Sequence, residues 1–143
     1  MKKLIYGILL ICMSLSLTNC EGGAGSYAPS NVGGKTMTIQ GTSAGTLTIN
    51  FKSNTSASIT TYRETINFSS IKYSKTSGNS AKLVISDIYV DFGFGTAKDT
   101  ENISLVFSSP NSGIANGTWT RKTISGETGS KNGTIDYESF TLF

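Results

Sequence analysis

The chain has 143 residues, of which 37% are hydrophobic and 15% are charged, and it contains no histidine. This length suits one domain and is too short for a TIM barrel or for two well-packed lobes. The absence of histidine removes most catalytic triads, most general bases and most zinc sites. We therefore expect a protein that is not an enzyme, with no catalytic residue, no metal site and no cofactor.

The first twenty residues have the pattern of a secretory signal. Two lysines precede an apolar run over residues 4–17, which is too short for a comfortable transmembrane span. The run ends in Leu17-Thr18-Asn19-Cys20. This motif resembles the lipobox of bacterial lipoproteins, although the residue before the cysteine is usually Gly, Ala or Ser rather than Asn19.

The lipobox resemblance implies that residues 1–19 are a signal peptide and that Cys20 becomes the first residue and carries acyl chains. The protein is then exported and anchored by lipid to the bacterial outer membrane, on its periplasmic or its cell-surface face. An ordinary secretory signal with a chance cysteine and an uncleaved anchor are the alternatives. Without the signal, ten basic and nine acidic residues remain, so we expect no nucleic-acid partner.

Residues 20–34 are expected to form a flexible tether behind the lipidated cysteine. Five glycines and one proline fall within residues 21–34, and a coil of this length has a typical reach of about 20 Å. We expect the folded domain to cover residues 35–143.

From Lys35 onward the pattern is that of β-strands. Apolar residues alternate with threonines and other polar residues, which is typical of half-buried antiparallel strands. Examples of the apolar set are Met37, Ile39, Leu47, Ile49, Phe51, Leu83, Ile85, Ile103, Leu105 and Phe107. Turn residues separate these runs at regular intervals. The sequence therefore predicts an all-β fold, a small antiparallel up-and-down barrel or barrel-like sandwich of about eight or nine strands.

The apolar face changes parity at three points along the chain. These points lie near Ser69–Ser70, Ser86–Asp87 and Glu138–Ser139, and a β-bulge or a tight turn at each would explain the change. Repeated bulges bend strands, and small barrels need bent strands. The pattern favours a barrel over a flat sandwich, which stays the alternative.

Four acidic residues lie close together in sequence, namely Asp87, Asp91, Asp99 and Glu101. Asp87 and Asp91 would share a strand face at a separation of about 13 Å, which is too far for a glycosidase pair. A loose calcium site is an alternative. We expect solvated charges on strands and loops.

Phe92, Phe94 and Trp119 are the candidate ligand-binding residues, because exposed aromatic rings stack on sugars or contact lipid. The alternative is that they fill the barrel. Gly117-Thr118-Trp119 resembles the G-x-W motif of the lipocalin- and avidin-type barrels, the calycins, where it marks the first strand rather than a late one. The resemblance implies that Trp119 closes one barrel end and that the interior holds a small apolar ligand.

Two functions are consistent with these patterns. The first is a lipid-anchored, calycin-like barrel that binds a small apolar molecule or a glycan. The second is a surface protein–protein interaction module, an adhesin-like or inhibitor-like lipoprotein, with a filled barrel and a protein partner. In both cases the chain contacts the membrane through its N-terminal anchor.

Overall fold

The computed structural model describes residues 25–42, 45–60, 65–68, 70–91, 95–123 and 130–143. This part of the chain consists of strands and connecting segments, and no helix in it is long and apolar enough to cross a membrane. The strands are β1 (Thr36–Gly41), β2 (Thr46–Ser53), β3 (Ser56–Thr60), β4 (Thr65–Phe68), β5 (Ile71–Lys75), β6 (Ser80–Asp91), β7 (Thr96–Ser109), β8 (Ser112–Thr123), β9 (Ser130–Ile135) and β10 (Tyr137–Leu142).

All the strands belong to one antiparallel sheet in the order β4-β3-β2-β1-β10-β8-β7-β6-β5, with β9 also paired to β8. Most sheet neighbours are also chain neighbours, so the topology is up-and-down, and β10 returns to pair with β1. Only Asp136 separates β9 from β10, and both pair with β8. The two segments therefore form one bent strand, and the predicted all-β barrel-like class is confirmed.

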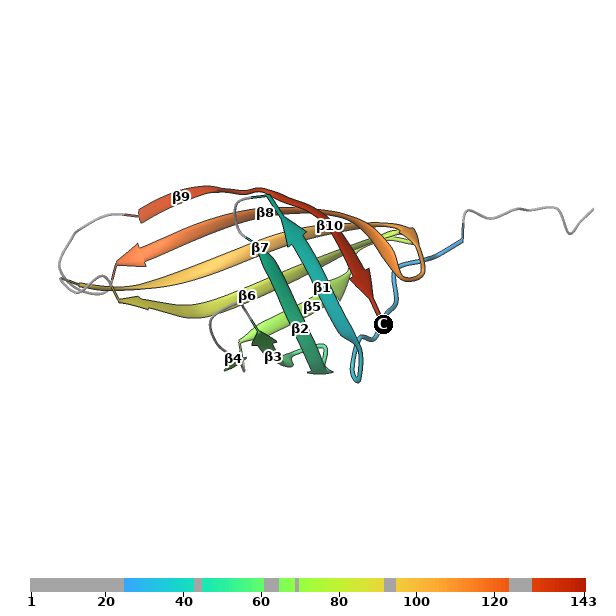
Figure 1. Ribbon diagram of the computed structural model, residues 1–143, viewed down its shortest axis with the longest axis horizontal. Helices are drawn as coiled ribbons and strands as arrows, with labels where there is room; N and C mark the ends of the chain where they lie inside the picture. The colour runs from blue at the N-terminus through green and yellow to red at the C-terminus, as the bar shows by residue number, and fades with distance from the viewer. Residues whose placement is uncertain (1–24, 43–44, 61–64, 69, 92–94, 124–129) are drawn as a thin grey trace, which may run out of the picture.

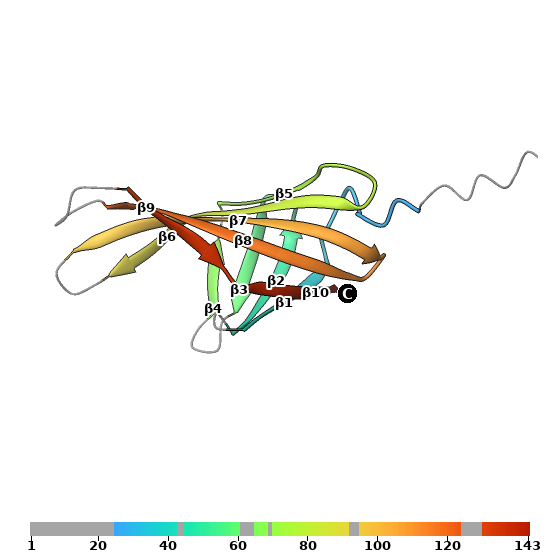
Figure 2. The ribbon, with the colours of Figure 1, turned by 90° about the horizontal axis from the view of Figure 1, so that it is seen from above.

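The sheet bends into a nearly closed barrel. Its two terminal strands are β4 and β5, and β5 approaches the β2–β3 turn, where the Tyr73 amide donates to the Asn54 carbonyl at 2.7 Å. The rings of Phe51 and Tyr73 meet edge to face there, 6.3 Å between centroids. β1–β4 cross the longer strands β6–β8, which project beyond them at one end (Figures 1 and 2). We call this projecting part, residues 86–91, 95–102 and 117–123 with β9, the extension.

The inner face of the barrel is apolar because alternate residues of each strand point inward. In β7, Ile103, Leu105 and Phe107 are buried while the residues between them are exposed. Phe107 packs edge to face on Phe140 of β10 at 4.7 Å between ring centroids. These side chains fill the middle of the barrel, and burying each large apolar side chain contributes about 1.5–3 kcal/mol.

Two of the three parity changes are β-bulges, as predicted. The β6–β7 register shifts between Ile85 and Ile88, and Asp87 has a φ of 58°, a left-handed conformation at the extra residue. Where β10 pairs with β1, the register shifts between Ser139 and Tyr137 and skips Glu138. At the third point β4 ends at Phe68 and β5 begins at Ile71, and residue 69 lies outside the described part.

The expectation of a flexible tether over residues 20–34 is wrong for its described part, residues 25–34. Ala28 and Val32 are 1% and 0% exposed and belong to the core. The backbone is held as well, because the Val32 amide donates to Asn54 Oδ1 at 2.9 Å and the Tyr73 hydroxyl donates to the Pro29 carbonyl at 3.0 Å. The two buried side chains and these hydrogen bonds hold residues 28–32 on the barrel, ahead of the predicted domain start at residue 35.

Candidate functional site

The inner face becomes polar where the strands enter the extension. In β7, Glu101 and Asp99 continue the inward-facing series that Ile103 begins. In β8, the same face carries Trp119 and Arg121, directly opposite Glu101 and Asp99. Tyr137, at the start of β10, completes a group that we call the polar cluster, made of Asp99, Glu101, Trp119, Arg121 and Tyr137.

Asp99 and Arg121 form a two-point ion pair. Arg121 Nε donates to Asp99 Oδ1 at 2.8 Å, and Nη2 donates to Oδ2 at 2.7 Å. Their side chains are only 13% and 23% exposed. This bidentate geometry fixes the guanidinium plane and occupies both carboxylate oxygens. The hydrogen bonds that Arg121 donates to Asp99 raise the pKa of Arg121.

Trp119 lies across the backbone of the neighbouring strand. A Cβ atom built at Gly133 of β9 would lie 2.6 Å from the Trp119 Nε1, so only glycine permits this approach. The Arg121 guanidinium lies 5.2 Å from the indole centroid, a cation–π distance. The indole is thus fixed by Gly133 and Arg121 while it stays partly exposed.

Tyr137 reaches over β8 to Glu101 on β7. A Cβ atom at Gly117 would lie 2.7 Å from the Tyr137 ring, so the ring passes directly over this glycine. The Tyr137 hydroxyl donates to Glu101 Oε2 at 3.1 Å. Burial raises the pKa of Glu101, the Tyr137 hydrogen bond opposes this shift and the charge of Asp99 adds to it; burial also raises the pKa of Tyr137.

The second oxygen of Glu101 remains accessible to solvent. Among the described residues, no buried side-chain nitrogen or oxygen lacks a hydrogen-bond partner. Oε1 of Glu101 accepts no hydrogen bond from the same residues, so it is not a buried atom. It can accept a hydrogen bond from a donor that approaches along the inner face.

The cluster brings three kinds of chemical group together on one face of the sheet. The charges of Asp99 and Arg121 cancel, a partly exposed indole offers an apolar surface, and Glu101 offers an acceptor. Convergent polar groups beside an aromatic ring and a carboxyl with a shifted pKa are typical of binding sites. A hydrolase of the two-carboxylate type needs both carboxylates available, whereas here Asp99 is fully engaged by Arg121.

Of the predicted ligand-binding residues, Trp119 lies in the polar cluster. Phe92, Phe94 and the predicted lipidation site Cys20 lie outside the described residues, so their roles stay predictions.

The expectation that the acidic residues are solvated is wrong for Asp99, which is 9% exposed, and for Glu101, which is half-buried. Both share parity with Ile103 and Leu105, and this signal in the sequence could have found them. The same reasoning places Arg121 on the same face of β8 as Trp119.

Asp87 instead lies on the outer face. Within the described part of the chain, no three His, Cys, Asp or Glu residues come together as a metal site.

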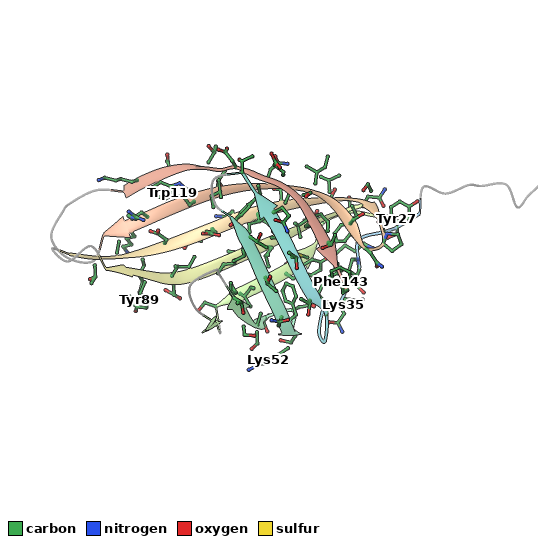
Figure 3. The ribbon with its side chains drawn as sticks, viewed as in Figure 1. Tyr27, Lys35, Lys52, Tyr89, Trp119 and Phe143 are labelled. Atoms are coloured by element: carbon green, nitrogen blue, oxygen red, sulfur yellow. The ribbon has the colours of Figure 1, made fainter. Side chains whose placement is uncertain are left out.

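The outer face of the extension carries a second, smaller group, which we call the outer patch. Lys98 Nζ lies 2.9 Å from Asp87 Oδ1 and 4.8 Å from the centroid of the Tyr89 ring. Tyr89 is 68% exposed. Figure 3 shows Tyr89 and Trp119 at the same end of the molecule, and the strand register puts them on opposite faces of the sheet.

No protein-family model matches the chain, and comparison with curated proteins and with solved structures gives no significant match.

Proposed function

We propose that this protein is an exported, lipid-anchored lipoprotein of the bacterial outer membrane that binds a glycan at the polar cluster. The observation that carries the proposal is the fixed arrangement of the partly exposed Trp119 indole beside Glu101 and the Asp99–Arg121 pair. Tryptophan offers a flat apolar surface to the C–H face of a sugar ring. Carboxylate and guanidinium groups form hydrogen bonds with the hydroxyls of the sugar.

A glycan fits this face better than the apolar ligand that the calycin resemblance implies. An apolar molecule seated on the cluster would remove Glu101 and the ion pair from water without replacing their hydrogen bonds, which is costly. An anion gains little either, because Asp99 already neutralises Arg121. A neutral sugar replaces the lost water contacts with its own hydroxyl groups.

The test is calorimetric titration of neutral oligosaccharides into the chain without residues 1–19, accompanied in the natural chain by the fluorescence of Trp119, the one tryptophan in the sequence. We expect at least one glycan to shift this emission, and Trp119→Ala or Glu101→Gln to weaken its binding about tenfold or more, which corresponds to about 1.4 kcal/mol. Tyr89→Ala is the matched control, since Tyr89 is exposed at the same end but on the other face. A glycan whose affinity depends on Tyr89 and not on Trp119 would contradict the site.

The lipid anchor has its own test. We expect mass spectrometry of the chain isolated from membranes to show an acylated Cys20 as the first residue, and Cys20→Ser to release the protein from the membrane fraction. An intact N-terminus or an unmodified Cys20 would overturn this part of the proposal and leave the binding site unaffected.

The outer patch favours the alternative function, a surface that binds a protein partner. Tyrosine is enriched at protein interfaces. Tyr89 is exposed, and the Lys98 ammonium lies over its ring. A partner whose capture is lost in Tyr89→Ala and kept in Trp119→Ala would establish this alternative.

A further inference from the structure

We propose that the end of the barrel where the N-terminal segment docks rests on an anionic lipid surface, so that the polar cluster points away from the membrane. The inference rests on the lipid anchor of the proposed function. It commits to one occupant of this end, a phospholipid bilayer, and to one orientation of the protein on it.

This end of the barrel, which we call the N-terminal end, is defined by hydrogen bonds between three segments. The Tyr27 amide donates to Asn79 Oδ1 at 3.0 Å, and the Asn79 carbonyl accepts from Phe107 at 2.7 Å. Beyond the β7–β8 turn, the Asn111 carbonyl accepts from Leu142, the neighbour of Phe143, at 2.8 Å. Tyr27 and Phe143 therefore lie at the same end, opposite Trp119 and Tyr89 (Figure 3).

The chain between the predicted anchor and this end is short. Ser26 is already attached to the barrel, since its hydroxyl donates to the Gly78 carbonyl at 3.1 Å and accepts from Lys75 Nζ. Five residues lie between Cys20 and Ser26, so even a fully extended chain spans at most about 20 Å. The docked segment therefore keeps the N-terminal end close to any membrane that holds Cys20.

Exposed apolar side chains gather at the same end. Of the five large hydrophobic residues that are exposed in the described part of the chain, Tyr27, Phe143, Val106 and Ile114 are 37%, 72%, 48% and 57% exposed. Val106 and Ile114 face each other across β7 and β8, within three residues of the turn that joins these strands. The fifth, Tyr89, lies in the extension. Aromatic and aliphatic side chains at the tip of a barrel suit contact with the headgroup region of a bilayer.

Charged residues are unevenly distributed along the sequence. Residues 25–86 hold one arginine, a single acidic residue, Glu64, and five lysines, Lys35, Lys52, Lys72, Lys75 and Lys82. Lys75 contacts Ser26, next to Tyr27, and Lys35 precedes Thr36, which pairs with Phe143 through two backbone hydrogen bonds. Seven of the nine acidic residues in the sequence lie after position 86. Lysine side chains close to an anionic leaflet strengthen the binding of a protein to that leaflet.

The orientation leaves the glycan site accessible. Ser109 at the turn lies ten positions after Asp99 in β7, which corresponds to about 30 Å along the strand. With the N-terminal end on the bilayer, the polar cluster and the outer patch face the aqueous phase.

The test uses the acylated chain that begins at Cys20, isolated from membranes. It is reconstituted into vesicles of phosphatidylcholine and phosphatidylglycerol that contain brominated lipid, which quenches nearby tryptophan. Single-tryptophan variants are made in a Trp119→Phe background as Tyr27→Trp, Phe143→Trp and, as the matched control at the other end, Tyr89→Trp. We expect Tyr27→Trp and Phe143→Trp to be quenched at least twofold more than Tyr89→Trp. Replacing Lys35 and Lys75 by glutamine should reduce this difference.

Equal quenching at the three positions, or stronger quenching of Tyr89→Trp, overturns the orientation even when Cys20 is acylated. If mass spectrometry finds Cys20 unmodified, the anchor of the proposed function fails instead. Contact of the N-terminal end with lipid is then tested by adding the Cys20→Ser chain to the same vesicles. Stronger quenching of Tyr27→Trp and Phe143→Trp than of Tyr89→Trp that depends on phosphatidylglycerol supports this contact. The absence of such quenching overturns it.

Discussion

Tyr137 and Glu101 are joined by a hydrogen bond of 3.1 Å that crosses the whole width of β8. The bond exists because Gly117 has no side chain beneath the tyrosine ring. It places a carboxyl group on the inner face of the sheet, where burial raises its pKa. This single contact links the fold of the extension to the chemistry of the candidate site.

The raised pKa of Glu101 predicts a particular dependence of stability on pH. A carboxyl whose pKa is higher in the folded than in the unfolded chain stabilises the fold when the pH is below the ordinary pKa of 4.5. This stabilisation is lost as the pH rises through the raised pKa. Glu101→Gln keeps an acceptor for Tyr137 and removes the charge. We expect the variant to gain in free energy of unfolding relative to the natural chain as the pH increases from about 4 to about 7, as measured by urea denaturation.

The control is Glu138→Gln, which removes the same charge from an exposed position of the sheet. A constant difference between Glu101→Gln and the natural chain over the same range would mean that burial does not shift the Glu101 pKa.

The Asp99–Arg121 pair should contribute more to stability than the Asp87–Lys98 pair. Asp99→Asn leaves the largely covered Arg121 without its counterion, and we expect the free energy of unfolding to fall by about 2 kcal/mol. Asp87→Asn is the matched control on the outer face, where both side chains are solvated and a surface ion pair contributes little. Equal effects of the two substitutions would show that the coverage of Asp99 has no energetic consequence.

The bulges show what the sequence can predict about this fold. An apolar face that changes parity needs one extra residue, and the changes near Asp87 and Glu138 correspond to register shifts in the sheet. The same parity argument places Asp99 and Glu101 on the inner face. The polarity of Asp99 and Glu101 suggests solvent exposure and so does not reveal the polar cluster. Side chains of a strand continue to alternate between its two faces after the apolar core ends.

Contacts between distant segments are harder to predict from sequence. Gly117 and Gly133 look like ordinary turn or strand glycines, and only the register reveals that aromatic rings from neighbouring strands lie over them. The docking of residues 25–34 depends in the same way on Asn54, whose side chain binds the Val32 amide and the Ser30 carbonyl from 22 and 24 residues away. No local pattern encodes these partners.

The docking of residues 25–34 predicts that removing one of their buried side chains lowers the stability of the fold. In a free tether the same substitution would have no effect on stability. Val32 is fully buried, and Val32→Ala should lower the free energy of unfolding by about 2 kcal/mol through lost burial and the cavity it leaves. Ser30→Ala is the control, because the Ser30 side chain is exposed and its backbone carbonyl still accepts from Asn54. Identical urea midpoints for Val32→Ala and the natural chain would mean that the segment does not dock.

The position of Trp119 over Gly133 can be tested through the fluorescence of this one tryptophan. A methyl group at Gly133 would lie 2.6 Å from the indole nitrogen, so Gly133→Ala must displace the ring. We expect a longer emission wavelength as the indole moves into water, a loss of stability of about 1 kcal/mol, and weaker binding of any glycan that the natural chain binds. Thr134→Ala, on the exposed side of the same strand, should change none of these. An emission spectrum that Gly133→Ala leaves unchanged would show that the indole does not rest on β9, and the aromatic surface of the proposed site would have to be sought elsewhere on the inner face.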